Sequence, residues 1–200
     1  MKMTHSIIQN KSDLEYFLER DKVALGKSAS KRPLPVKDVI WKYQILLRKT
    51  EYHKNTRKTP FGSLLYALYA VRKRNLGNKL GFSVPENVFG PGLSIGHVSP
   101  IVVNSQAKVG CNCRLNDSVT IGATNGSPKA PVLGDNVFLG SGARLIGDIS
   151  IADDVAIGAG AVVVKSIDES DTTWGGVPAR RLSGSGSRSN LNAALFDEHI

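Results

Sequence analysis

VLGDNVFLGSGARLIGDISIADDVAIGAGAVVV, residues 132–164, repeats one pattern every six residues. An aliphatic marker residue recurs at this spacing, at Leu133, Leu139, Leu145, Ile151, Ile157 and Val163. A small or aliphatic residue lies four places after each marker. A period of six fits neither the helix period of 3.6 nor the strand period of two. It is typical of hexapeptide repeats, in which each hexad supplies one short strand and one corner of a parallel β-helix.

The same pattern extends upstream, with markers at Phe89, Ile95, Val103, Val109, Leu115 and Ile121. The steps Ile95–Val103 and Ile121–Leu133 are longer than six, which indicates extra residues at those corners. Gly or Ala often follows a marker directly and allows a tight corner. Residues 81–182 are therefore predicted to form a mainly β domain. Cys113 is expected to point into its core and Cys111 to point outward.

Residues 1–80 are predicted to form a small helical domain. Ser12 and Glu15 fit a capping box, opening a helix that ends near Gly26. Apolar residues at helical spacing predict a second helix over Val36–Tyr52 and a third over Phe61–Asn75. The apolar side of the third helix consists of Leu64, Leu65, Leu68 and Val71. At the other end of the chain, residues 183–200 open with SGSGSRSN and are expected to form a flexible tail.

The net charge of +9 is concentrated in one region. Between Lys22 and Leu80, fifteen Lys/Arg residues accompany two acids, a local net charge of +13. A basic surface of this kind suits an anionic partner, such as a phosphorylated substrate or, by peripheral contact of residues 22–80, a membrane. A solvated basic face is the alternative. No nucleic-acid module is recognisable, so a nucleic-acid partner is not expected.

The cysteines and the hydropathy suggest the compartment. Cys111 and Cys113 are one residue apart, too close for an ordinary disulfide, and no second pair completes a zinc site. No apolar run reaches the roughly 18 residues of a membrane span, and the first residues lack a signal-peptide core. We therefore expect a cytoplasmic protein, either free or at the inner face of the membrane, with no metal.

Several motifs together resemble a known family. They are the hexads, GPGLSIGH (90–97), VTIG (119–122) and GGVPAR (175–180). This ordered set is similar to the hexapeptide-repeat acyltransferases over roughly residues 80–183, specifically their serine acetyltransferase branch. That branch includes O-acetyltransferases of bacterial polysaccharide synthesis. The resemblance implies a left-handed parallel β-helix and acetyl-CoA as donor substrate. It also implies a homotrimer with active sites between subunits, with a dimer of trimers as a further expectation.

Acetyl transfer to a hydroxyl requires a base that removes the hydroxyl proton, and histidine suits this role because its free pKa lies near 6.5. Of the four histidines, His5 and His199 lie near the ends of the chain, and His53 lies in a basic loop. His97 lies two residues past the marker Ile95, which directs it out of the core, and it matches the family's catalytic histidine. The alternative is a packed imidazole without function.

A catalytic base needs a group that orients it. The family has aspartate directly before this histidine and a second acid about one coil earlier, where this chain has Gly96 and Phe82. One coil of eighteen residues, plus two for the long step before Val103, places residue 117 over residue 97. Asp117, or its neighbour Asn116, is therefore the predicted orienting group. An ordinary exposed carboxylate is the alternative for Asp117.

The resemblance also implies residues for the donor. Gly140, Ser141 and Ala159 match positions that lie against the pantetheine arm of CoA, and small residues permit its close approach. Gly122 and Ala123 match positions near the thioester, where a backbone amide could face the oxyanion.

Three basic residues past the last coil, Lys165, Arg180 and Arg181, are expected to meet the adenosine phosphates of CoA. All of these donor-side residues have structural alternatives, as corner residues or solvated cations.

The acceptor is less defined. The family's Arg-His pair, which helps hold serine, is missing from the loop GATNGSPKAPVLG (122–134), whose only charged residue is Lys129. This favours a sugar hydroxyl in bacterial polysaccharide biosynthesis, on a small-molecule or lipid-linked acceptor. Serine O-acetylation is the alternative, and a non-catalytic β-helix scaffold is the alternative of another class. A γ-type carbonic anhydrase is excluded because the β-helix contains one histidine and that site needs three.

Overall fold

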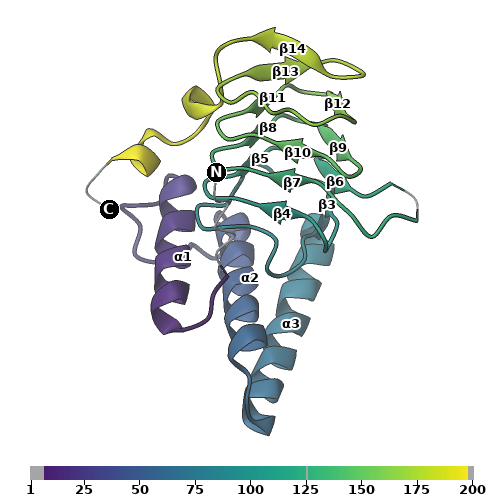
Figure 1. Ribbon diagram of the computed structural model, residues 1–200. Helices are drawn as coiled ribbons and strands as arrows, with labels where there is room; N and C mark the ends of the chain where they lie inside the picture. Colours follow the sequence, from purple (N-terminus) through teal and green to yellow (C-terminus); the bar gives the residue numbers. More distant parts are fainter. Residues whose placement is uncertain (1–6, 125, 198–200) are drawn as a thin grey trace.

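The computed structural model describes residues 7–124 and 126–197. Three helices stand at one end of a stack of short strands (Figure 1). They are α1 (Lys11–Ala24), α2 (Val39–Thr56) and α3 (Pro60–Leu80). Within the described part of the chain, no helix is long and apolar enough to span a membrane.

The strands form three parallel sheets that are the faces of a β-helix. One face consists of β1 (Phe82–Ser83), β3 (Ile101–Val103), β6 (Thr120–Gly122), β9 (Arg144–Ile146) and β12 (Val162–Val163). The second consists of β4 (Lys108–Val109), β7 (Val132–Leu133) and β10 (Ser150–Ile151). The third consists of β2 (Ser94–Ile95), β5 (Arg114–Leu115), β8 (Phe138–Leu139), β11 (Ala156–Ile157), β13 (Thr173–Gly175) and the antiparallel β14 (Arg180–Ser183). The predicted fold class, a left-handed parallel β-helix after a helical domain, is confirmed.

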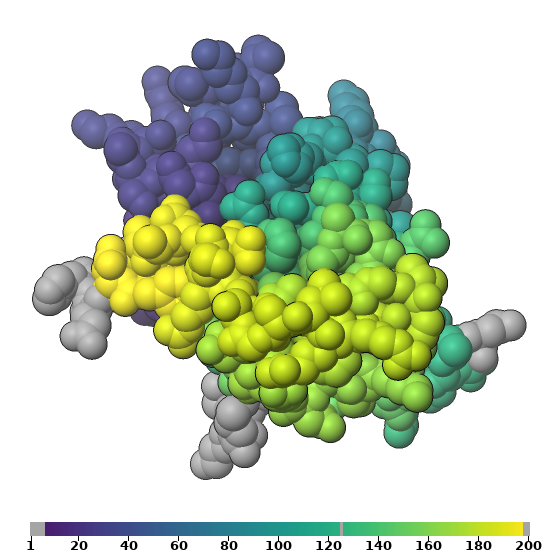
Figure 2. Space-filling view, turned by 90° about the horizontal axis from the view of Figure 1, so that it is seen from above, coloured from purple at the N-terminus to yellow at the C-terminus, as the bar shows by residue number. Residues whose placement is uncertain are grey.

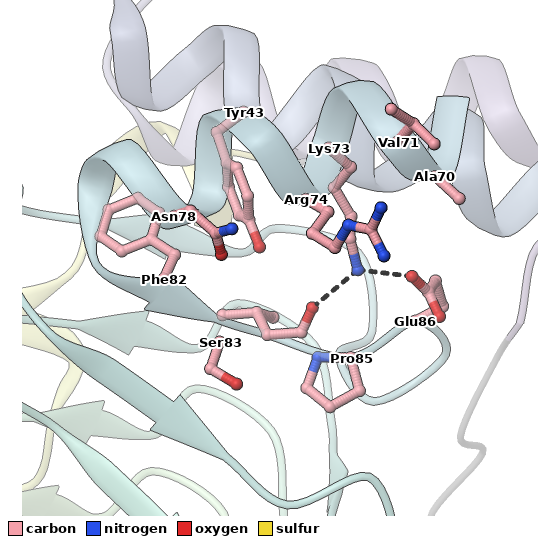
Figure 3. A pocket seen from close by; sticks show the side chains of 11 residues that line it. Tyr43, Ala70, Val71, Lys73, Arg74, Asn78, Phe82, Ser83, Pro85 and Glu86 are labelled. Carbon is pink, nitrogen blue, oxygen red and sulfur yellow. Dashed lines mark hydrogen bonds and ion pairs between the residues drawn. The ribbon is translucent and has the colours of Figure 1, made fainter. Parts of the chain in front are cut away.

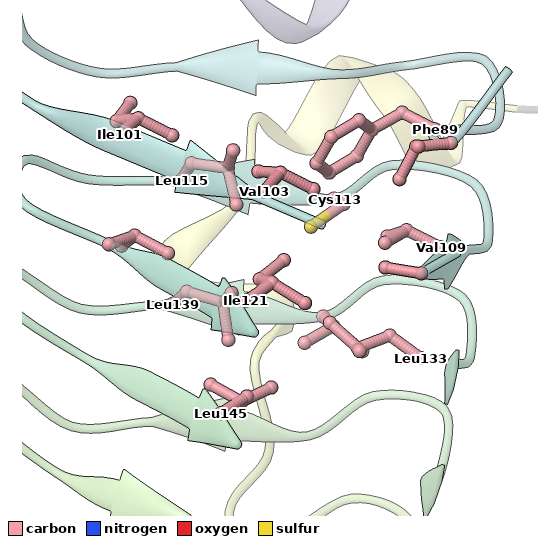
Figure 4. Close-up of a cluster of buried hydrophobic side chains, with 14 of the residues drawn as sticks. Phe89, Ile101, Val103, Val109, Cys113, Leu115, Ile121, Leu133, Leu139 and Leu145 are labelled. Atoms are coloured by element: carbon pink, nitrogen blue, oxygen red, sulfur yellow. The ribbon is translucent and has the colours of Figure 1, made fainter. Parts of the chain in front are cut away.

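The strand register follows the spacing of the markers. Leu139 pairs with Ile157, one regular coil of eighteen residues. Ile95 pairs with Leu115 because the corner after β2 contains two extra residues. Leu115 pairs with Leu139 because the loop after β6 adds six. The markers stack as a continuous apolar core (Figure 4), in which Cys113 is buried as predicted.

The helices differ from their predicted bounds. Asn10 caps α1: its side chain accepts from the Asp13 amide, while the Asp13 carboxylate accepts from the Gln9 amide. The predicted capping box at Ser12 was therefore wrong, because Ser12 lies inside the first turn. The second helix starts at Val39 rather than Val36.

The third helix continues five residues beyond the predicted Asn75, to Leu80. Gly81 then ends it in the left-handed conformation, with φ of +80°. Three residues of its predicted apolar side, Leu64, Leu68 and Val71, are exposed in the single chain.

A buried ion-pair network joins the helices to the first coil. Arg48 of α2 is fully buried, and its guanidinium donates to Asp21 and Glu51 and to the carbonyls of Phe89 and Gly90. These bonds occupy all five guanidinium N–H groups. The Asp21 carboxylate also accepts from the amides of residues 92 and 93. The network fixes the helices against the turn that precedes β2.

The chain after β14 packs instead of forming the expected flexible tail, as far as residue 197. It returns along the β-helix to α1 (Figures 1 and 2), where Leu191 and Leu195 are buried against Val23 and Ala24. The Asn192 side chain donates to the carbonyl of Val23. The composition of SGSGSRSN indicated a linker, but the apolar residues that follow it provide a binding surface for α1.

Candidate active site

His97 lies at the corner between β2 and β3 and is exposed. β2 is the edge strand of its sheet, and the Gln44 side chain of α2 pairs with its free edge. Gln44 donates to the carbonyl of Leu93 and accepts from the amide of Ile95, as a neighbouring strand would. The helical domain thereby holds the strand that leads into His97.

The register places Asp117 next to His97, as the coil count predicted. Ile95 pairs with Leu115, and the Gly96 amide donates to the Leu115 carbonyl at 2.8 Å. Residues 97 and 117 therefore follow equivalent positions on adjacent coils, one strand spacing apart.

Two groups act on the carboxylate of Asp117. The Ser141 hydroxyl donates to it from the next coil. This hydrogen bond holds the pKa of the Asp117 carboxyl below its usual range, and the charge of His97 lowers it further. Asp117 is therefore ionised wherever an imidazole titrates. It can stabilise the imidazolium form of His97.

Asn116 does not take the orienting role that the sequence left open for it. Its side-chain oxygen is buried and has no hydrogen-bond partner within residues 7–124 and 126–197. This oxygen lies 2.9 Å from the point where a Cβ on Gly96 would stand. The Asn116 side chain thus occupies space that an aspartate at position 96 would need.

The predicted pantetheine residues form a column with Asp117. The amides of Gly142 and Gly160 donate to the carbonyls of Asp117 and Ser141, so residues 117, 141 and 159 lie on successive coils at one corner. A Cβ on Gly140 would come within 2.7 Å of the Ala159 nitrogen, so coil stacking itself requires glycine there.

Gly122 and Ala123 lie elsewhere. β6 begins at Thr120, after the corner that contains Asp117, and ends at Gly122, so the two residues lie at the next corner. Within one chain they are not brought to His97.

Three predicted phosphate-binding residues share one pocket. Lys165, Arg180 and Arg181 line a cavity of ≈430 Å³ together with Trp174. Arg181 forms an ion pair with Glu169 at 2.9 Å. The cavity lies beside β12 and β14, near the end of the β-helix opposite the helices.

Other candidate groups are paired, stacked or poorly reactive, or lie outside the described residues. Lys129 forms an ion pair with Asp148 at 2.7 Å, so it is not a free cation of the long loop. His53 stacks on Tyr69, with ring centroids 4.8 Å apart. Burial and the nearby Asp135 raise the pKa of the Cys111 thiol to about 11, which makes it a poor nucleophile. His5 and His199 lie outside the described residues.

A second pocket of ≈350 Å³ lies between α3 and the loop after β1 (Figure 3). Lys73 extends into it and pairs with Glu86 and with the carbonyl of Val84. The pocket belongs to the junction of the two domains and contains none of the predicted site residues.

The arrangement at His97 can carry out base catalysis. An exposed imidazole lies beside an ionised carboxylate, and the carboxylate is fixed by a hydroxyl from the next coil. The sequence did not reveal Gln44 or the link from Ser141 to Asp117. A coil count would have placed position 141 over Asp117, but the helix that covers β2 has no signal in the repeat.

Comparison with known proteins gives consistent results. The family described as "Bacterial transferase hexapeptide (six repeats)" matches residues 130–165. The serine acetyltransferase of Synechococcus elongatus is 39% identical over 101 residues, which are 50% of this chain and 41% of that protein. The chain therefore spans less than half the length of this relative.

Two solved structures are similar in fold. Serine acetyltransferase from Brucella abortus strain S19 superposes with a TM-score of 0.66 and 22% identity, over 88% of this chain and 72% of that one. A structure described as "Serine Acetyltransferase- Complex with CoA" gives a TM-score of 0.61 and 21% identity, over 86% and 71% of the two chains. At these identities the likeness shows the fold.

Proposed function

Because the chain is a hexapeptide-repeat protein of the serine acetyltransferase-like type, we propose that it transfers the acetyl group of acetyl-CoA to a hydroxyl. The observation that carries this proposal is the exposed His97 beside the ionised Asp117. His97 takes the hydroxyl proton as the oxygen attacks the thioester carbonyl. Collapse of the tetrahedral intermediate expels the CoA thiolate, which receives that proton, and leaves the O-acetyl ester.

The donor side rests on the column at one corner and on the cationic pocket. The pantetheine arm lies against Ser141 and Ala159, while Lys165 and Arg180 meet the phosphates of CoA. The relative with bound CoA supports this donor.

L-serine is the acceptor that the relatives support, since those compared are named serine acetyltransferases. A sugar hydroxyl, favoured by the sequence, has no support from these names. It is retained as a second candidate for one reason: the loop that holds the family's Arg-His pair offers only Lys129, and Asp148 neutralises it.

The assembly proposed is a cytoplasmic homotrimer. It would bring Gly122 and Ala123 of one subunit toward His97 of another, because within one chain they lie at different corners. An apolar stripe on α3, defined as Phe61, Leu64, Leu68 and Val71, is exposed in the single chain and available to a second copy.

The decisive experiment measures thiol release from acetyl-CoA with L-serine, with sugars and with no acceptor. His97→Ala is expected to lower kcat about 10²- to 10⁴-fold, the usual contribution of a general base. His53→Ala is the matched control and should leave kcat unchanged, because His53 stacks on Tyr69 in the helical domain. Undiminished turnover by His97→Ala would remove His97 from the mechanism. Absence of thiol release with every acceptor would favour the scaffold alternative.

A further inference from the structure

Arg114 borders the proposed catalytic base. It is the outward-facing residue of β5, in register with Ser94 of β2. One terminal guanidinium nitrogen lies 3.7 Å from the point where a Cβ on Gly96 would stand. Because Gly96 directly precedes His97, the positive charge lies next to the residue that activates the acceptor.

The charge of Arg114 is not neutralised. Its guanidinium has no carboxylate partner and no hydrogen bond within residues 7–124 and 126–197, although the side chain is partly buried. Lys129 is paired with Asp148 and Arg181 with Glu169. Arg114 has no such carboxylate in the described part of the chain, although it is more buried than the exposed Arg144. A guanidinium that has lost part of its hydration without gaining a partner attracts an anion.

Gly96 places no side chain of its own beside the guanidinium. The nearest neighbour there is Asn116, whose oxygen lies 2.9 Å from the same Cβ position. An aspartate at position 96 would put a negative charge near Arg114, but it would require the Asn116 side chain to move. Position 96 therefore lacks the aspartate of the resembled family, and the neighbouring Arg114 has no carboxylate partner among the residues that the structure describes.

We infer that Arg114 binds the anionic group of the acceptor and thereby selects which hydroxyl compound is acetylated, an inference that rests on the proposed function. A guanidinium donates two parallel N–H groups to a carboxylate or phosphate. In L-serine only the α and β carbons separate the carboxylate from the hydroxyl, so one end can bind Arg114 while the other reaches His97. A sugar phosphate offers the same chemistry from a second source.

The experiment compares acceptors that carry an anionic group with analogues that lack it. L-serine is set against L-serinamide, and glucose 1-phosphate against glucose, in the thiol-release assay with wild-type protein and Arg114→Gln. For whichever anionic acceptor the enzyme acetylates, the variant should raise KM about 10- to 100-fold. This factor corresponds to the free energy of a charge-assisted hydrogen bond. KM for acetyl-CoA and for the analogue without the anionic group should not change. Arg114→Lys should recover part of the lost affinity for the anionic acceptor. Lysine restores the positive charge but not the two parallel N–H donors of the guanidinium.

Arg144→Gln is the matched control, because Arg144 is an exposed arginine of β9 on another face. Equal losses for acceptors with and without the anionic group, or no change in KM, would overturn the inference. Calorimetric titration with the same four compounds measures binding without turnover. It therefore tests the inference about Arg114 separately from the proposed function. Anion binding that Arg114→Gln weakens, in a chain without thiol release, would support the inference and reject the transferase. No anion binding by wild-type protein would overturn the inference.

Discussion

Asp117 lies on the coil after His97, whereas the family that the chain resembles has one acid directly before the histidine and another about one coil earlier. Its backbone lies one strand spacing away, and its carboxylate accepts a hydrogen bond from the hydroxyl of Ser141. Such a group stabilises the protonated base that forms during proton abstraction, and it also fixes the ring orientation. Asp117 is thus proposed as a positioning residue that replaces the aspartate missing at Gly96.

Asp117→Asn should lower kcat while leaving KM for acetyl-CoA unchanged. It should also move the acidic limb of the pH–rate profile to lower pH, because the imidazolium loses a stabilising negative charge. The lowered pKa of Asp117 means that its own protonation falls below the range of that limb. Steady-state rates across pH test this, with Asp148→Asn, an exposed carboxylate of another corner, as control. An unchanged rate and profile would eliminate the role.

For single residues, the sequence predicted the features that depend only on position within the six-residue repeat. The markers showed that His97 points outward, and counting the extra residues before Val103 placed Asp117 beside it. Gln44 and Arg114 could not be found in this way. Their roles depend on how long side chains extend across neighbouring elements, and the repeat contains no information about that.

For the helices, too, the sequence could not predict features that depend on contacts with other elements. Asn10 with Asp13 and Ser12 with Glu15 both fit a capping box, and only packing decides between them. The apolar spacing in α3 was predicted correctly. It did not show whether another element packs on that side, because periodicity identifies an apolar face but not its partner. The β-strands were predicted more closely, since each marker must stack on the marker one coil later.

The Arg48 network should control the stability of the domain junction. Asp21→Asn removes the negative charge that pairs with Arg48 and leaves a buried, partly uncompensated guanidinium. Breaking a buried pair in this way costs about 3–5 kcal/mol of the free energy of unfolding. Urea denaturation measures the loss. Glu15→Gln, which breaks the exposed pair with Lys11, should cost less than about 1 kcal/mol. Similar values for the two variants would contradict a structural role of the network.

For the whole molecule, the division into a helical part and a β-helix was readable from the change in period near Gly81. The packing of the end of the chain was not. Leu191 and Leu195 resemble isolated apolar residues in a polar tail, and their partners Val23 and Ala24 lie more than 160 residues earlier. Contacts between residues so far apart in the sequence leave no local pattern. The composition therefore predicted a flexible linker for a segment that packs against α1.

The α3 stripe, which leaves Phe61 68% and Leu64 65% exposed, gives the last prediction. A proposed trimer that buries this stripe gains about 1.5–3 kcal/mol for each leucine covered. The double variant Leu64→Glu/Leu68→Glu replaces that gain with buried charge, so light scattering should show a fall in mass toward the monomer. The control Leu34→Glu changes an equally exposed leucine in a loop and should keep the wild-type mass. If both variants keep it, α3 faces solvent in the assembly and the subunits associate through the β-helix alone.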